Sequence, residues 1–151
     1  IVDIFLPDFK YISSEMAARY SNAPDYPEVA KRALAQMVKQ TGDAKFDERD
    51  MMKRGVIVRH LILPGHIKES KEAIRYLYET YGDQIYISIM NQYTPMPGIE
   101  KRFKNLGRTI TQKEYDEVVD YAIDLGVENG FIQEGETAKE SFIPQFDDTG
   151  L

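Results

Sequence analysis

Residues 55–65 read Gly-Val-Ile-Val-Arg-His-Leu-Ile-Leu-Pro-Gly, and this stretch sets the fold class. The run from Gly55 to Leu63 is almost continuously apolar and ends at a Pro-Gly pair. Such a run is typical of a strand that is covered on both faces, as the strands of parallel sheets are. Parallel strands need crossover connections, so the segments on either side should be helices that cover the sheet.

Three further β-rich runs alternate with helical patterns along the chain. Together with Gly55–Leu63, the predicted strands are Val2–Leu6, Gln84–Met90 and Gly130–Gln133. The predicted helices are Ser13–Tyr20, Pro27–Gln40, Lys68–Thr80 and a last helix from the cap at Thr111 to about Leu125. Asp25 and Thr111 each precede a glutamate by three residues, a spacing typical of a helix start. Glycines follow three of the helical patterns as stops: Gly42, Gly82 and Gly126.

This alternation predicts an α/β fold with mostly parallel strands, either a partial βα-barrel or a curved open sheet. Four strands cannot close a barrel alone. Val2–Leu6 would then be an exposed edge strand, poorly covered or paired with another copy of the chain. The polar residues 134–151 are expected to wrap the body as an extended segment.

The composition narrows the class of protein. The 151 residues, 42% hydrophobic and 29% charged, fit one globular domain. The net charge of −6 and the lack of a long apolar run predict no nucleic-acid partner, no membrane partner and a cytoplasmic location. The chain has no cysteine, which excludes disulfides and cysteine-bound metals within it. It starts at Ile1, inside a predicted strand, and we therefore expect a piece of a larger protein.

Polar side chains follow three of the predicted strands. Asp8 and Lys10 stand two residues apart, which puts both on one face of an extended segment. Arg59 interrupts the apolar strand, and Gln92 with Tyr93 follows the strand that ends at Met90. Because the carboxyl ends of parallel strands meet at one edge of the sheet, we expect these groups to line one crevice.

Each of these residues also has a structural interpretation. Asp8 and Lys10 could form a surface ion pair, which contributes little to stability. An Arg59 that faces inward needs an anion, supplied either by a carboxylate of the protein or by a ligand. Gln92 and Tyr93 could simply finish a strand.

The two histidines and the common glycine motifs favour no other site. His60 has the opposite strand parity to Arg59 and is predicted to pack toward the helices, while His66 follows a turn and should start a helix. Two histidines without cysteines make a weak metal site. The glycine motifs of phosphate-loop NTPases, dinucleotide-binding domains and serine hydrolases are absent.

Four stretches taken together resemble the radical S-adenosylmethionine (SAM) proteins, in the branch related to pyruvate formate-lyase-activating enzyme. They are Leu6-Pro7-Asp8-Phe9-Lys10, Val58-Arg59-His60-Leu61-Ile62-Leu63-Pro64-Gly65, Met90-Asn91-Gln92-Tyr93-Thr94-Pro95 and Glu128-Asn129-Gly130-Phe131-Ile132-Gln133. The resemblance covers essentially the whole chain as the C-terminal half of such a protein. It implies a partial βα-barrel of six strands, of which this chain begins at the fourth.

The resemblance also implies roles for the strand-end residues. Lys10 would hold the methionine carboxylate of SAM, with Asp8 beside it at a bound monovalent cation. Arg59 and the backbone of Leu61 would lie along the methionine or the sugar of SAM. Gln92 or Tyr93 would supply the contact from the sixth strand, where activating enzymes typically have a histidine that this chain lacks.

The implied chemistry needs groups that this chain does not carry. In the family, a Cys-x-x-x-Cys-x-x-Cys loop in the N-terminal half holds a four-iron four-sulfur cluster, which reduces SAM to methionine and a 5′-deoxyadenosyl radical. That radical abstracts a hydrogen atom, in true activating enzymes from a partner glycyl-radical enzyme. The chain alone is therefore predicted to be inactive.

Two other functions stay open from the residues alone. Lys10 could be the nucleophile of a Schiff-base lyase on a βα-barrel, although a neighbouring Asp8 would raise the pKa of its amine and weaken it as a nucleophile. The chain could also be a non-catalytic interaction domain that pairs through its open edge.

Overall fold

The structure is a computed structural model, and it describes residues 3–132. Its strands are β1 (Ile4–Phe5), β2 (Lys45–Phe46), β3 (Met52–Leu61), β4 (Tyr86–Met90) and β5 (Gly130–Ile132). Its α-helices are α1 (Ser14–Ser21), α2 (Tyr26–Thr41), α3 (Ile67–Tyr81) and α4 (Gln112–Leu125). Three short 3₁₀ turns are η1 (Gly82–Gln84), η2 (Ile99–Lys101) and η3 (Lys104–Gly107). The predicted wrapping of residues 134–151 lies outside the described residues.

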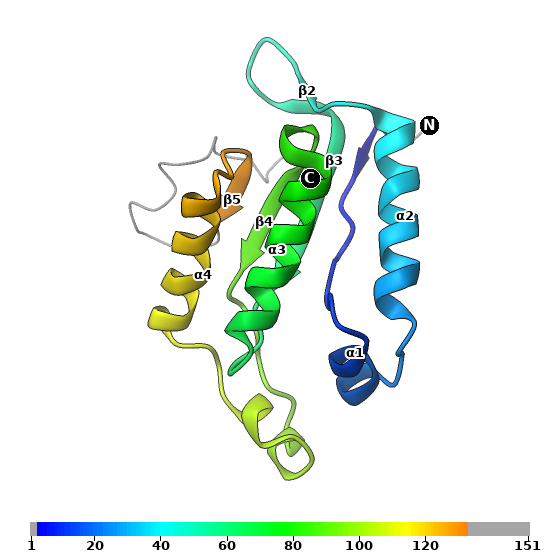
Figure 1. The fold of residues 1–151 in the computed structure, drawn as a ribbon. Coiled ribbons are helices and arrows are strands. Elements are labelled where there is room, and N and C mark those ends of the chain that lie inside the picture. Colours follow the sequence, from blue (N-terminus) through cyan, green and yellow to red (C-terminus); the bar gives the residue numbers. More distant parts are fainter. Residues whose placement is uncertain (1–2, 133–151) are drawn as a thin grey trace.

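Strands and helices alternate along the chain, as predicted for an α/β fold. Strands β1, β3, β4 and β5 pair in that order, and all three pairings are parallel (Figure 1). A helix follows each of the first three of these strands, because each parallel connection has to cross back over the sheet. Within residues 3–132, β1 pairs with β3 alone and forms one edge, as predicted for the first strand.

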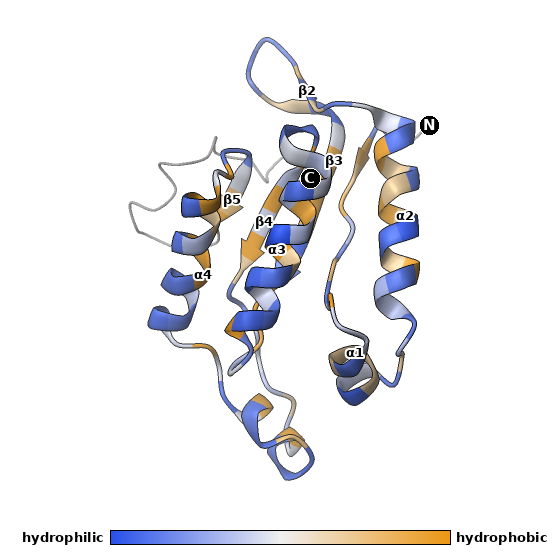
Figure 2. Ribbon diagram, in the orientation of Figure 1, coloured by the Kyte–Doolittle hydropathy of each residue, from blue (hydrophilic) through white to orange (hydrophobic). Residues whose placement is uncertain are grey.

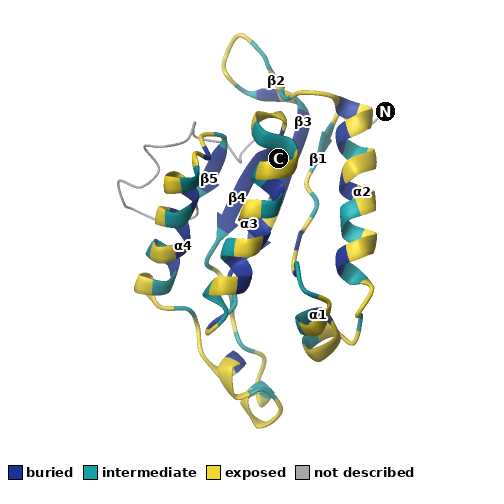
Figure 3. Ribbon diagram, viewed as in Figure 1, coloured by how far each residue is buried: buried dark blue, intermediate teal, exposed yellow. Residues whose placement is uncertain are grey.

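The helical side of the sheet carries the main core. Side chains from α2, α3 and α4 pack together against β3 and β4. The isoleucine stripe Ile85, Ile87 and Ile89 is at most 1% exposed there. Figure 2 shows apolar strands behind helices whose outer faces are polar, and Figure 3 shows the same division as buried strands and exposed helix faces. Val56, Val58 and Ile62 of the apolar run face this core. The predicted cover on both faces holds at Ile57 but not at Arg59, which is exposed on the opposite face.

The opposite face of the sheet has a smaller core. Met52, Ile57, Tyr86 and Phe131 are buried together near the strand starts. Strand β2 reinforces this end by pairing antiparallel with the first residues of β3. The sequence did not predict β2, because two residues are too few for a period-2 pattern. Its pairing also explains why β3 begins at Met52 rather than at Gly55.

The helix ends mostly follow their sequence signals. Thr111 accepts from the backbone N–H of Glu114, whose carboxylate in turn accepts from the N–H of Thr111, which completes the capping box. Gly42 and Gly126 terminate α2 and α4 with positive φ. Asp25 occupies the N-cap position of α2, but its side chain makes no capping hydrogen bond. Among residues 3–132, no helix combines the length and the apolar character needed to cross a membrane.

Candidate functional site

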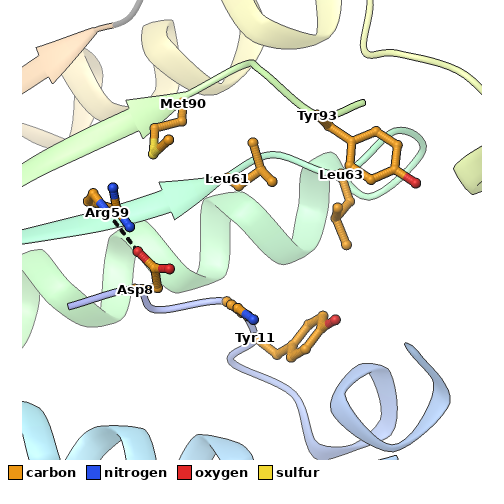
Figure 4. A pocket seen from close by; sticks show the side chains of 8 residues that line it. Asp8, Tyr11, Arg59, Leu61, Leu63, Met90 and Tyr93 are labelled. Carbon is orange, nitrogen blue, oxygen red and sulfur yellow. Dashed lines mark hydrogen bonds and ion pairs between the residues drawn. The ribbon is translucent and has the colours of Figure 1, made fainter. Parts of the chain in front are cut away.

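A cavity of about 250 Å³ opens where β1, β3 and β4 end. The residues that line it are Asp8, Lys10, Tyr11, Arg59, Leu61, Leu63, Met90 and Tyr93. Figure 4 shows the Asp8–Arg59 pair at one end of this cavity and the rings of Tyr11 and Tyr93 at the other. The predicted crevice at the carboxyl ends of the strands is therefore present.

Arg59 and Asp8 form an ion pair at the cavity. The Nε of Arg59 donates to Oδ1 of Asp8 over 2.7 Å, and the two side chains are 44% and 45% exposed. The two residues are also neighbours in a parallel bridge that extends the β1–β3 pairing past β1. The anion that Arg59 requires is thus a carboxylate of the protein. A pair this exposed adds little stability, so its main effect is to neutralise the charges of Arg59 and Asp8 within the cavity.

The side chain of Lys10 lines the cavity without a bond to another described residue. The backbone N–H of Lys10 donates to the hydroxyl of Tyr26 over 3.0 Å, but within the described residues its ammonium has neither an ion pair nor a hydrogen bond. The alternative that Asp8 and Lys10 form a surface ion pair is therefore excluded, because Asp8 pairs with Arg59 across the strands instead. An unpaired ammonium beside a cavity can bind an anionic group through charge-assisted hydrogen bonds.

The rest of the cavity wall is apolar and held in place. Leu61 and Leu63 follow Arg59 with strand parity along β3 and its extension, and Met90 ends β4. Tyr93 donates its hydroxyl hydrogen bond to the carbonyl of Leu106 over 2.7 Å, and burial raises the pKa of Tyr93. The cavity therefore presents the ammonium of Lys10 and the Asp8–Arg59 pair at a largely apolar surface.

Gln92 and the histidines lie outside this cavity. Gln92 is exposed and does not line it, because Tyr93 takes the inward position after β4. His60 is 1% exposed on the helical side, as its parity predicts, and burial lowers its pKa. His66 occupies the N-cap position of α3, in agreement with the predicted helix start, and its Nε2 lies 2.7 Å from the hydroxyl of Tyr20.

Three of the lining residues were not among the predicted site residues: Tyr11, Leu63 and Met90. Leu63 shares strand parity with Arg59 and Leu61, so the pattern of the strand contains the signal. Tyr11 carries no comparable signal, since it belongs to an irregular segment after β1.

The chain does not carry the ligands of an iron–sulfur cluster. It contains no cysteine. Within residues 3–132, no three His, Cys, Asp or Glu side chains gather closely enough to hold a metal ion.

The chain matches no protein-family model and no solved structure. It is 28% identical over 122 residues to an uncharacterized protein of Methanocaldococcus jannaschii, MJ0674. The match takes in 81% of this chain and 32% of that protein, so the chain spans about a third of the length of this curated relative.

Proposed function

We propose that the cavity is the SAM-binding part of a radical SAM enzyme, of which this chain is the C-terminal half of the βα-barrel. One observation carries the proposal: within the described residues, the ammonium of Lys10 has no partner. It lies at a largely apolar cavity, beside the Asp8–Arg59 pair, whose charges neutralise each other. SAM combines a carboxylate with an apolar methionine chain and an adenosine, and this wall suits such a ligand.

Each group of lining residues has a separate role in the proposed binding of SAM. Lys10 would hold the carboxylate of SAM, and Leu61, Met90 and Tyr93 would exclude water along the methionine and the nucleoside. The Asp8–Arg59 pair would direct polar atoms of the ligand without adding net charge. The bound cofactor would supply radical chemistry for hydrogen abstraction in the intact protein, and glycyl-radical activation is one such reaction. This chain lacks the ligands of an iron–sulfur cluster, so its own part in that chemistry is to bind and orient SAM.

Binding of SAM to the purified chain tests the proposal by titration calorimetry. We expect saturable binding that Lys10→Met weakens by about tenfold to a hundredfold, the loss that one hydrogen bond to a charged group gives. Lys113→Met, at an exposed position of α4, is the matched control and should bind as wild type does. Absence of binding by the folded wild-type chain, or equal affinity of both variants, would contradict the proposal.

One observation favours a second function. Asp8 pairs with Arg59 rather than with Lys10, so the objection that Asp8 weakens Lys10 as a nucleophile loses its force. A Schiff-base lyase would then use Lys10 on a carbonyl substrate. Borohydride trapping with a small ketoacid, followed by mass spectrometry of the peptide that contains Lys10, separates this function from SAM binding. A covalent adduct supports the lyase, and an unmodified peptide removes it.

A further inference from the structure

The segment from Asp8 to Ser13 brings Lys10 and Tyr11 to the cavity but belongs to no helix, and only Asp8 joins the sheet. Its backbone makes one bond to the sheet beyond β1, from the N–H of Phe9 to the carbonyl of Arg59 over 2.8 Å. Irregular segments of this kind are normally mobile. Here, side chains from three surrounding elements form hydrogen bonds with five more of its backbone groups.

The first contact comes from α3. The Oε2 of Glu69 accepts from the N–H of Ile12 over 2.7 Å and from the N–H of Ser13 over 2.9 Å. Glu69 is 8% exposed and has no cationic partner among residues 3–132. A buried carboxylate without a cation is costly unless hydrogen bonds satisfy it, and these two N–H groups do so.

The second contact comes from β3 and α3 together. The Nδ1 of His60 donates to the carbonyl of Phe9 over 2.8 Å, because a carbonyl can only accept. The Nε2 of His60 then accepts from the hydroxyl of Ser70, also over 2.8 Å. His60 and Ser70 are 1% and 2% exposed, so this chain of bonds is shielded from water.

The third contact comes from α2. The hydroxyl of Tyr26 accepts from the N–H of Lys10 over 3.0 Å and donates to the carbonyl of Asp8 over 2.9 Å. The carbonyls of Asp3 and Pro7 accept hydrogen bonds from β3. Backbone groups alternate in direction along an extended segment, so those of Asp8 and Lys10 point away from β3, toward the free edge. Tyr26 therefore occupies the position that a further strand would fill, and burial raises the pKa of its hydroxyl.

We propose that Glu69, with Tyr26 and the His60–Ser70 pair, positions the segment from Phe9 to Ser13 and thereby fixes Lys10 at the cavity before a ligand arrives. None of the four lines the cavity, so they act through the backbone rather than by touching the ligand. A preset segment spares the ordering that a flexible lysine loop would undergo on binding. The effect on a ligand rests on the proposed function, whereas the ordering of the segment does not.

Amide hydrogen exchange of the ligand-free chain tests the ordering. Glu69→Ala should speed exchange at Ile12 and Ser13 by about tenfold or more, because both amides lose a charged acceptor. Glu69→Gln should speed it less, since its neutral oxygen still accepts in the same place. Glu72→Ala is the matched control, a glutamate of the same helix with no bond to this segment, and should change nothing at these amides.

Unchanged exchange at Ile12 and Ser13 in a folded Glu69→Ala chain would overturn the positioning role. If that variant does not fold, Glu69→Gln decides: a local rise in exchange at the two amides supports the role, and no rise overturns it. In SAM titrations, Glu69→Ala should weaken binding in the wild-type background and have no further effect on Lys10→Met, because the effect passes through Lys10. Additive losses would overturn the link to the cavity, and failure of the wild type to bind would overturn only the proposed function.

Discussion

At the scale of single residues, one carboxylate ties the end of β3 to the start of α4. The carboxylate of Glu114 accepts hydrogen bonds from both terminal nitrogens of Arg108, at 2.8 and 3.0 Å. It also accepts from the backbone N–H groups of Thr111 and Gly65, each at 2.9 Å. The hydrogen bonds from the Arg108 guanidinium are the main reason that the pKa of Glu114 falls from 4.5 to about 2. Its side chain is only 12% exposed. The turn after β3 is therefore held by a charged group that stays ionised.

This arrangement predicts a pH-dependent stability difference for Glu114→Gln. Because the pKa of Glu114 is depressed in the folded chain, its contribution is full above about pH 5 and is lost as the pH falls from 4.5 toward 2. The free energy of unfolding of the variant should be about 1–3 kcal/mol lower than that of the wild type at neutral pH, and the difference should vanish near pH 2. Urea unfolding at several pH values measures it. Glu128→Gln, at an exposed position, is the control; a difference that did not shrink in acid would contradict the account.

At the scale of secondary-structure elements, Gly55 allows β3 to pair with two different strands, β2 and β1. Strand β3 pairs antiparallel with β2 at residues 52–54 and parallel with β1 from Gly55 onward. Gly55 has φ of +146°, and a Cβ there would meet the Cα of Ala44 at 3.0 Å. Other side chains rarely adopt such a backbone, and the approaching chain leaves no room. The glycine that the sequence predicts as the strand start is thus a junction inside a longer strand.

Gly55→Ala should lower the free energy of unfolding by about 1–3 kcal/mol through backbone strain, and the contact with Ala44 should add to this loss. Gly98→Ala tests the contact separately, since Gly98 has φ of +83° and a methyl group added there would meet nothing within 4 Å. Thermal or chemical unfolding of both variants gives the comparison. Equal losses would show that the approach of Ala44 is unimportant.

At the scale of the whole molecule, the described residues form an open, mostly parallel sheet whose edge strands are β1 and β5. Tyr26 covers the β1 edge at Asp8 and Lys10, but Leu6 is 40% exposed before them. An apolar hollow of about 240 Å³ lies beside it, with Val29 and Met37 of α2 in its wall. Free edges with apolar neighbours tend to pair with other chains.

We therefore expect the chain to self-associate through β1, and sedimentation velocity at increasing concentration measures this. Leu6→Lys, directly after β1, should weaken the association, because a lysine at a sheet edge opposes pairing. Ile123→Lys on α4 is a control of matched exposure, 41% against 40%, and should leave the association as it is. A wild-type chain that stays monomeric, or equal loss in both variants, would contradict pairing at β1.

Local signals in the sequence were enough to predict the parallel α/β order, the four helices and the carboxyl-end crevice. These signals are the apolar run 55–63, the Thr111–Glu114 capping box and strand parity, which separates Arg59 from His60.

The folded chain was needed to show that Asp8 pairs with Arg59, that Lys10 has no such pair within residues 3–132 and that Gln92 lies outside the cavity. These outcomes depend on the register between strands and on contacts between distant parts of the sequence, such as that of Asp8 with Arg59, 51 residues apart. Local periodicity carries no information about such contacts, because it describes which face a side chain takes and not what lies opposite it.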